Sequence, residues 1–221
     1  MSRGLPRAAD LAIALVGLVL ASPILLAAAI AIRLESRGRV IYRQPRVGQD
    51  GVVFDLFKLR TMRQGADPIG VGTAVTADDP RVTRVGRLLR RFSLDELPNL
   101  FNVIRGEMAI VGPRATLPAQ VELYTPRQRR RLELKPGVTG RAQIHGRAGI
   151  PWEERIELDV WYVEHRSVRL DLRILARTPR ALLGGAGSVA KDPYAGSSPD
   201  SPLRRAAEQE ESVSRTGAEG D

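Results

Sequence analysis

The sequence predicts a mostly helical α+β protein whose N-terminus enters a membrane. Three observations support this fold class: an uncharged apolar run near the N-terminus, short strand signals outnumbered by helical periodicity in the middle, and a polar C-terminus without periodicity. The predicted units are a membrane-inserted helix-break-helix over residues 1–35, a globular domain over 36–181 with a small β-hairpin or sheet and interfacial amphipathic helices, and a disordered tail over 182–221.

Composition and charge restrict the chemistry. The 221 residues include no cysteine and two histidines, which excludes disulfides and thiol catalysis and argues against a histidine-rich metal site. A metal would therefore be a hard, oxygen-bound cation such as Mg²⁺. Residues 1–180 carry a net charge of +12 and the remaining residues −3. A body this basic is expected to bind the phosphates of a nucleotide, a lipid headgroup or a nucleic acid.

The apolar run spans residues 11–32, which are 22 residues without a charge. As one helix it would be roughly 33 Å long, about the thickness of a bilayer's hydrocarbon core. Ser22-Pro23 interrupts its middle, where proline removes a helical hydrogen bond. Both flanks are basic, so positive charge favours neither orientation of a spanning helix. Two interpretations remain open: a kinked spanning helix, and a re-entrant hairpin that enters and leaves on the same, cytoplasmic face.

A β-hairpin is predicted next, because residues 40–42 and 52–54 are apolar and flank an Asp50-Gly51 turn. The second strand leads to Lys58 and Arg60, and residues 64–80 read as a loop. Residues 81–92 then repeat apolar side chains at helical spacing, with arginines that include Arg90 on the opposite face. This basic amphipathic helix either lies in a membrane interface or packs on the domain's own core.

Asp95 and Glu96 follow this helix directly. Two adjacent carboxylates among arginines can hold an anionic ligand and still offer a nucleophile, a base or a metal ligand. A structural interpretation competes with this one, because Ser93 and Glu96 have the spacing of a capping box that would begin a helix through Leu100. The cap does not account for Asp95, and the two interpretations are compatible.

Further along, residues 108–111 form a short apolar strand that ends at Gly112-Pro113-Arg114. Glycine there permits close backbone approach, and arginine can bind a phosphate with two hydrogen bonds. Residues 120–134 and 152–165 are predicted helices, separated by turn residues at 135–140 and by a segment that carries Arg147. The first helix has four arginines expected to face solvent or headgroups: Arg127, Arg129, Arg130 and Arg131.

Taken in order over residues 6–181, these segments resemble the bacterial sugar transferase family, the monotopic phosphoglycosyl transferases. The resemblance rests on Ser22-Pro23, Arg43-Gln44-x-Arg46-Val47-Gly48, Phe57-Lys58-Leu59-Arg60-Thr61-Met62, Ser93-Leu94-Asp95-Glu96-Leu97-Pro98, Val111-Gly112-Pro113-Arg114, Lys135-Pro136-Gly137-Val138-Thr139-Gly140 and Leu170-Asp171-Leu172-Arg173-Ile174-Leu175. Each motif is weak alone, but the ordered set is specific. Leu59, Arg141 and His145 depart from the family's usual phenylalanine, tryptophan and asparagine, which leaves the sugar open. The chain resembles the minimal catalytic form.

The resemblance implies an enzyme of the bacterial inner membrane with its catalytic domain on the cytoplasmic face. Asp95 would attack the β-phosphorus of a UDP-sugar, UMP would leave, and a polyprenyl (undecaprenyl) phosphate would take the phosphosugar, as the first membrane step of exopolysaccharide, capsule or glycoconjugate assembly. Asp95 and Glu96 would hold Mg²⁺. The expected phosphate and nucleotide contacts are Lys58, Arg60, Arg90, Gly112, Pro113, Arg114 and Arg147. A homodimer and downstream glycosyltransferases are the expected protein partners.

Two other functional classes explain the same charge. A membrane-tethered nucleic-acid binder would use the basic surface, but the sequence offers no aromatic-studded basic strand or recognised nucleic-acid motif. A lipid-binding membrane scaffold without catalysis would use the apolar segment and the amphipathic helix, and it would not need the Asp95-Glu96 pair. Magnesium-dependent release of UMP from a UDP-sugar separates the enzyme from both.

Overall fold

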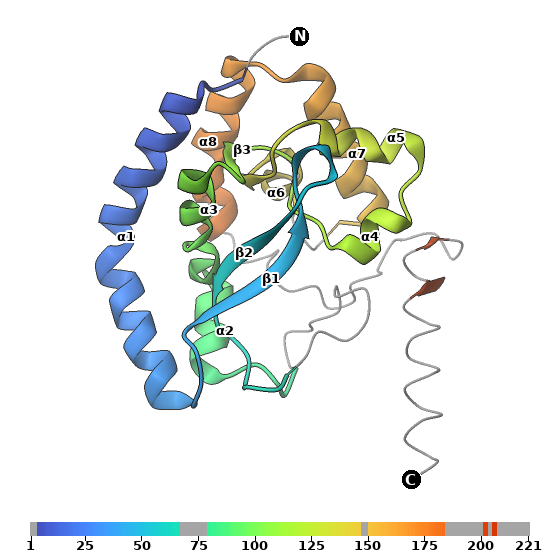
Figure 1. Ribbon diagram of the computed structural model, residues 1–221. Helices are drawn as coiled ribbons and strands as arrows, with labels where there is room; N and C mark the ends of the chain where they lie inside the picture. The colour runs from blue at the N-terminus through green and yellow to red at the C-terminus, as the bar shows by residue number, and fades with distance from the viewer. Residues whose placement is uncertain (1–3, 67–78, 147–149, 184–200, 203–204, 207–221) are drawn as a thin grey trace, which may run out of the picture.

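The computed structural model describes residues 4–66, 79–146, 150–183, 201–202 and 205–206 (Figure 1). The elements in chain order are α1 (Arg7–Glu35), β1 (Ile41–Val47), η1 (Gln49–Gly51), β2 (Val53–Leu59), α2 (Arg84–Arg91), η2 (Leu94–Glu96), α3 (Asn99–Arg105), β3 (Ala109–Val111), α4 (Pro118–Glu122), α5 (Pro126–Arg129), η3 (Arg130–Glu133), β4 (Gly137–Thr139), α6 (Arg141–Ile144), α7 (Trp152–His165) and α8 (Val168–Leu183). The described part is mostly helical, with an antiparallel sheet β1–β2 and a parallel sheet β3–β4. The mostly helical α+β class is confirmed.

The apolar run folds into α1, which bows around the body along the left of Figure 1. Its buried residues recur at helical spacing and are mostly alanines: Asp10, Ala14, Ala21, Ala28 and Ile32. The large side chains point outward, and Val19, Leu20 and Leu34 are 72–83% exposed. By length and composition the helix could cross a membrane. One face therefore packs closely on the body, and the other presents a continuous apolar surface.

The predicted break at Ser22-Pro23 is not observed, because α1 continues through Pro23. Proline lacks an N–H, which leaves the carbonyl of Val19, four residues earlier, without its helical donor. The Ser22 hydroxyl donates to this carbonyl at 2.8 Å. Serine side chains compensate for proline in membrane helices in this way. The Ser-Pro pair thus bends the helix without ending it.

Both ends of α1 are bound to the same body. Near the N-terminus, the buried Asp10 accepts a hydrogen bond from the backbone N–H of Ile110 at 3.0 Å. At the C-terminus, the Arg60 guanidinium donates to the carbonyl of Ser36 at 2.8 Å. There Glu35 also accepts the first backbone N–H groups of α2, at 2.7 and 2.9 Å. The helix is therefore fixed at both ends rather than hinged at one.

The β-hairpin is confirmed, and its register pairs Tyr42 with Lys58. Asp50 and Gly51 take left-handed backbone angles, with φ of 55° and 81°, as the turn requires. Alternate residues of β2 point to the same side of a strand. Phe54 and Leu56 are buried, so Lys58 lies on the same face at the edge of the core.

The capping-box prediction is wrong. Ser93 takes a left-handed conformation with φ of 53°, and its side chain makes no capping hydrogen bond. The segment forms the short 3₁₀ helix η2, and α3 begins only at Asn99, after Pro98. Ser93 cannot cap a helix in this conformation, because a cap requires extended backbone angles. Glu96 is therefore free to bond with cations.

The helix predicted over residues 120–134 is also corrected, since α4, α5 and η3 replace it. Pro126 begins a new helix, and Thr125 caps it by accepting from the N–H of Gln128 at 3.3 Å. Arg131 lies in η3, which follows α5, and its side chain points inward. Contrary to the prediction of a solvated face, the side chain of Arg131 is 6% exposed.

The main core is shared by α1, β2, α3, β3, α7 and α8. Its buried residues are Ala14, Phe54, Leu56, Leu100, Val103, Met108, Ile110, Val111, Ala115, Tyr162 and Ile174. Fully buried Asn102 joins α3 to β2, because its side chain accepts from the N–H of Phe57 at 3.1 Å and donates to the carbonyl of Asp55 at 2.7 Å. This clamp fixes β2 beside η2, where the two acidic residues lie.

The predicted tail lies largely outside the described residues, so its disorder stays a prediction. Of the described positions in it, Ser201 is buried, and Ala206 packs against a cluster that contains Tyr124 and Trp152.

Candidate active site

The acidic pair lies on η2 between β2 and α3. Asp95 is buried, with 9% of the residue exposed. Ser93, two residues before Asp95 and immediately before η2, has a left-handed backbone, which is strained for a residue other than glycine. Strain of this kind persists only where the surroundings over-determine it, and it is concentrated at functional sites. The chain therefore turns sharply to present two consecutive carboxylates.

Glu96 is held by two cations on one oxygen. Lys58 Nζ lies 2.9 Å from its Oε1, and Arg114 Nη2 lies 2.8 Å from the same atom. Burial would raise the pKa of Glu96, but the charges and hydrogen bonds of Arg114 and Lys58 outweigh it and hold the pKa well below its usual range. Glu96 is thus a permanent anion at neutral pH.

Asp95 has the opposite balance. Burial raises its pKa above the usual range, and the neighbouring Glu96 adds to this, while Lys58 and Arg90 oppose it. Arg90 is itself positioned by its Nε, which donates to the Thr61 hydroxyl at 2.8 Å. An anion that is poorly solvated is a stronger base and nucleophile than one in water. The pair therefore divides into a fixed anion and a reactive one.

Three of the predicted phosphate contacts, Lys58, Arg90 and Arg114, lie around the acidic pair. Arg60 is engaged elsewhere, since its guanidinium bonds to the carbonyls of Ser36 and Arg37 at the end of α1. Arg147 lies outside the described residues.

Gly112 and Pro113 serve the β3–β4 contact. The N–H of Gly112 donates to the carbonyl of Thr139 at 3.0 Å, and the carbonyl of Pro113 accepts from Gly137 at 2.8 Å. A Cβ on Gly112 would lie 2.4 Å from the carbonyl oxygen of Lys135. The predicted close backbone approach is therefore present, but its partner is the chain itself.

Sequence reasoning missed Arg46 and Arg155 as site residues. Arg46 Nη1 donates to the carbonyl of Ala115, next to Arg114, at 3.3 Å. Burial, and then repulsion from Arg114, lowers the pKa of both Arg46 and Arg155 to about 10. The Nε of each is buried without a hydrogen-bond partner among the described residues. The position of Arg46 in a family motif was the available signal, and Arg155 offered none.

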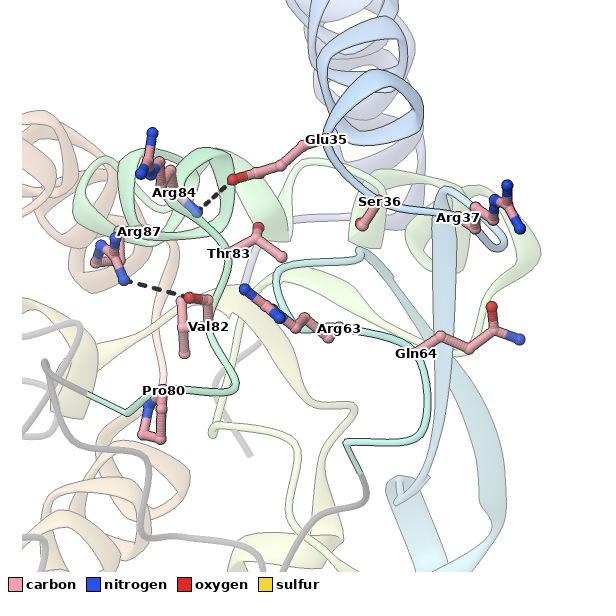
Figure 2. Close-up of a pocket in the computed structure, with 10 residues that line it drawn as sticks. All are labelled: Glu35, Ser36, Arg37, Arg63, Gln64, Pro80, Val82, Thr83, Arg84 and Arg87. Atoms are coloured by element: carbon pink, nitrogen blue, oxygen red, sulfur yellow. Dashed lines mark hydrogen bonds between the residues drawn. The ribbon is translucent and has the colours of Figure 1, made fainter.

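A cavity of about 450 Å³ lies elsewhere, between the end of α1 and the start of α2 (Figure 2). Arg63, Arg84 and Arg87 line it, and neither Asp95 nor Glu96 does. It is a separate basic hollow and adds nothing to the acidic pair.

The acidic pair can supply part of the coordination shell of a magnesium ion. The described residues contain no group of three or more acidic, histidine or cysteine side chains that could hold a metal. Mg²⁺ usually takes one or two carboxylates and completes its shell with water and substrate phosphates. Both cations on Glu96 bind Oε1, and among the described residues no hydrogen bond to Oε2 is found. Asp95 and Glu96 could therefore supply the protein ligands for an ion that arrives with a phosphate substrate.

Residues 1–185 match the bacterial sugar transferase family. The chain belongs to that family. It is 45% identical over 183 residues to a sugar transferase of Bacillus subtilis, EpsL, which covers 83% of this chain and 89% of the relative. It is 44% identical to the UDP-glucose:undecaprenyl-phosphate glucose-1-phosphate transferase of Caulobacter vibrioides, over 80% of this chain and 69% of the relative.

A third relative, from Escherichia coli, has the same enzyme name and is 43% identical over 80% of this chain, which spans 40% of the relative's length. The resemblance drawn from the motifs is therefore confirmed, and with it the expectation that this chain is an enzyme. A bacterial sugar transferase, not a scaffold or a nucleic-acid binder, is the class that the comparisons establish.

Proposed function

We propose that this sugar transferase moves a sugar-1-phosphate from a UDP-sugar to a polyprenyl phosphate such as undecaprenyl phosphate. The observation that carries the proposal is the asymmetry of the acidic pair, in which a buried Asp95 of raised pKa stands beside a Glu96 fixed by Lys58 and Arg114. The relatives named for UDP-glucose and undecaprenyl phosphate support the two substrate classes.

In the first step, an Asp95 carboxylate oxygen attacks the β-phosphorus of the UDP-sugar. A phosphorus–oxygen bond forms to Asp95, the bond to the bridging oxygen breaks, and UMP leaves with that oxygen. Lys58 and Arg90 face the carboxylate, and together with Arg114 they neutralise the charges that would otherwise repel an anionic nucleophile from a diphosphate. The product is a phosphosugar bound to Asp95.

In the second step, a phosphate oxygen of the polyprenyl phosphate attacks the same phosphorus, and the Asp95 carboxylate leaves. Each step exchanges one phosphorus–oxygen bond for another, so the carboxylate is regenerated without a net change. Mg²⁺, held by Asp95 and Glu96, would supply further neutralisation of phosphate charge. The lipid product would then pass to downstream glycosyltransferases.

We further propose that α1 is re-entrant, with both its ends on the cytoplasmic face of the inner membrane. The support is that Asp10 at one end and Arg60 at the other bind α1 to the same body. A helix that crossed the bilayer would place these two ends on opposite sides. The outward apolar face of α1 would then hold the acidic pair near the headgroups, where a lipid phosphate and a soluble nucleotide sugar can meet.

The test is release of UMP by the purified full-length enzyme with Mg²⁺, undecaprenyl phosphate and a panel of UDP-sugars. We expect UMP release that requires both Mg²⁺ and one or a few of the sugars. Asp95→Asn should lose at least about 10³-fold in turnover and all trapping of a phosphosugar on the protein, because an amide cannot act as the anionic nucleophile. An Asp95→Asn enzyme that keeps substantial turnover excludes the covalent route.

A further inference from the structure

We propose that Asp159 and Arg131 are positioning residues that hold the main chain of Arg114 so that its guanidinium meets Glu96. The inference deepens the proposed function and rests on it, since Arg114 matters only if Glu96 belongs to the working site.

The geometry encloses the peptide groups of one residue. The backbone N–H of Arg114 donates to Asp159 Oδ2 at 3.2 Å, and its carbonyl accepts from Arg131 Nη2 at 2.9 Å. The same Nη2 also donates to the same Oδ2, so the ion pair and Arg114 form a closed ring. One residue earlier, the carbonyl of Pro113 is bonded to the N–H of Gly137. The backbone of Arg114 is thus fixed on both sides, and only its side-chain torsions remain adjustable.

The Arg131–Asp159 ion pair is buried more deeply than it would need to be if it only stabilised the fold. The side chains of Arg131 and Asp159 are 6% and 1% exposed. Removing two charges from water costs several kcal/mol, and a well-packed apolar pair often serves a fold as well or better. Arg131 is itself held by the hydroxyl of Tyr124 at 2.5 Å, and that hydroxyl also bonds to Thr116 at 2.8 Å. An arrangement this polar in the interior indicates a specific task, and the backbone of Arg114 is what it encloses.

A second ion pair, which also joins residues 126–133 to α7, provides the contrast. Arg127 of α5 lies 3.1 Å from Glu157 of α7, and these side chains are 56% and 50% exposed. This pair also joins the segment before β4 to α7, but it makes no contact with Arg114. If the only role of the Arg131–Asp159 pair were to join residues 126–133 to α7, the exposed Arg127–Glu157 pair would fill that role without burying charge.

The experiment is a double-mutant cycle on turnover, with Asp159→Asn, Arg114→Gln and the double variant in the full-length enzyme. We expect Asp159→Asn alone to lower kcat/KM about 10–100-fold, because displacement of a site group by about 1 Å can cost that much. In the Arg114→Gln background the same substitution should cost less than about 2-fold, since there is no guanidinium left to misplace. Effects that multiply across the cycle overturn the positioning role.

Calorimetric titration with UMP gives a second readout, because loss of folded protein lowers the number of binding sites whereas misplacement of Arg114 lowers the affinity. We expect Asp159→Asn and Arg114→Gln to weaken UMP affinity to a similar degree, and the double variant to be no weaker. An unchanged affinity with fewer sites overturns the proposal. Arg127→Gln is the matched control and should change neither quantity.

If Asp159→Asn fails to fold, Tyr124→Phe replaces it in the cycle, because it removes one hydrogen bond to Arg131 and leaves the charges in place. We expect a loss of about 2–10-fold that disappears in the Arg114→Gln background. A loss that persists there overturns the proposal. Turnover by Asp95→Asn is the separate result that would exclude the proposed function, so the two failures are distinguishable.

Discussion

Two groups of arginines show how differently one residue type is used in this molecule. The inner group, Arg46, Arg131 and Arg155, lies close to Arg114 and to the acidic residues Glu96 and Asp159. The outer group, Arg127, Arg129 and Arg130, lies on α5 and η3. There Arg127 pairs with Glu157 and Glu164, and Arg130 with Glu133 and Glu164, on the surface. The sequence contains the two groups as indistinguishable positive charges. Burial and partners separate them.

The difference is energetic. An exposed ion pair contributes about 0–1 kcal/mol, because water and salt screen it. A buried cation instead loses its hydration and must recover that loss from nearby anions. The inner group has few carboxylates to pair with, because Glu96 already forms ion pairs with Lys58 and Arg114. Arg46 and Arg155 are therefore under-compensated, and a phosphate substrate would complete their environment.

Among effects on UMP affinity and on stability, the largest is expected from the inner group. Arg46→Gln and Arg155→Gln should each weaken UMP affinity about 10–100-fold, because each removes a charge-assisted phosphate contact worth about 1.5–3 kcal/mol. The melting temperature should stay the same or rise, since each variant removes a half-buried charge that has few anionic partners. Calorimetric titration and thermal melting measure the two quantities. Arg43→Gln is the control, because Arg43 is an exposed residue on the same strand as Arg46. Equal losses of UMP affinity in the two variants would contradict a special role for the inner arginines.

An intermediate effect is expected from the acidic pair itself. Burial raises the pKa of Asp95 above its ordinary value of 3.8, so between that value and the folded pKa the folded protein keeps a proton that the unfolded chain has released. The free energy of unfolding therefore decreases as the pH rises from 3.8 through the folded pKa. The Asp95→Asn variant lacks the titrating carboxyl group, so its stability does not decrease in this way. In EDTA at pH 7 the variant should melt at a higher temperature than the wild type. The difference should vanish below pH 3.8, and a variant less stable at pH 7 would contradict the assignment.

The smallest effect is expected from the outer group. Arg130→Gln removes contacts to Glu133 at 3.0 Å and Glu164 at 2.6 Å, yet all three side chains are 26–40% exposed. We expect almost no change in the free energy of unfolding, because water and salt screen exposed ion pairs, and UMP release within about 2-fold of the wild type. Denaturant unfolding at low and high salt measures the first quantity. A loss as large as that of Arg46→Gln would place the outer arginines in the site.

Local sequence patterns correctly predicted those elements whose conformation depends mainly on neighbouring residues in the chain. The hairpin, β3 and the helix over residues 152–165 follow from turn chemistry and periodicity. The capping box failed because Ser93 takes a left-handed conformation, in which its side chain makes no capping hydrogen bond. The helix over 120–134 failed because Pro126 begins a new helix in the middle of a favourable pattern.

The site was predicted in part for the same reason. Asp95 and Glu96 are adjacent in sequence, so their pairing required no knowledge of the fold. Arg60 was assigned to phosphate through the resemblance, as part of the same motif as Lys58. It lies just beyond the last residue of β2, and its side chain turns toward the end of α1. Asp159 and Arg131 could not be found, because their significance lies in contacts to Arg114 that span 45 and 17 residues.

The attachment of α1 at both ends sets an order of events during synthesis. Asp10 bonds to a residue 100 positions later, and the N–H of Leu5 bonds to Asp171, 166 positions later. At about 5–20 residues per second, the ribosome delivers those partners roughly 5–30 s after the helix has emerged. With α1 placed in the membrane as proposed above, the helix is available to the lipid before the body exists to receive it. The catalytic domain would then fold against a helix already in the bilayer, and each molecule would mature at the membrane where it works.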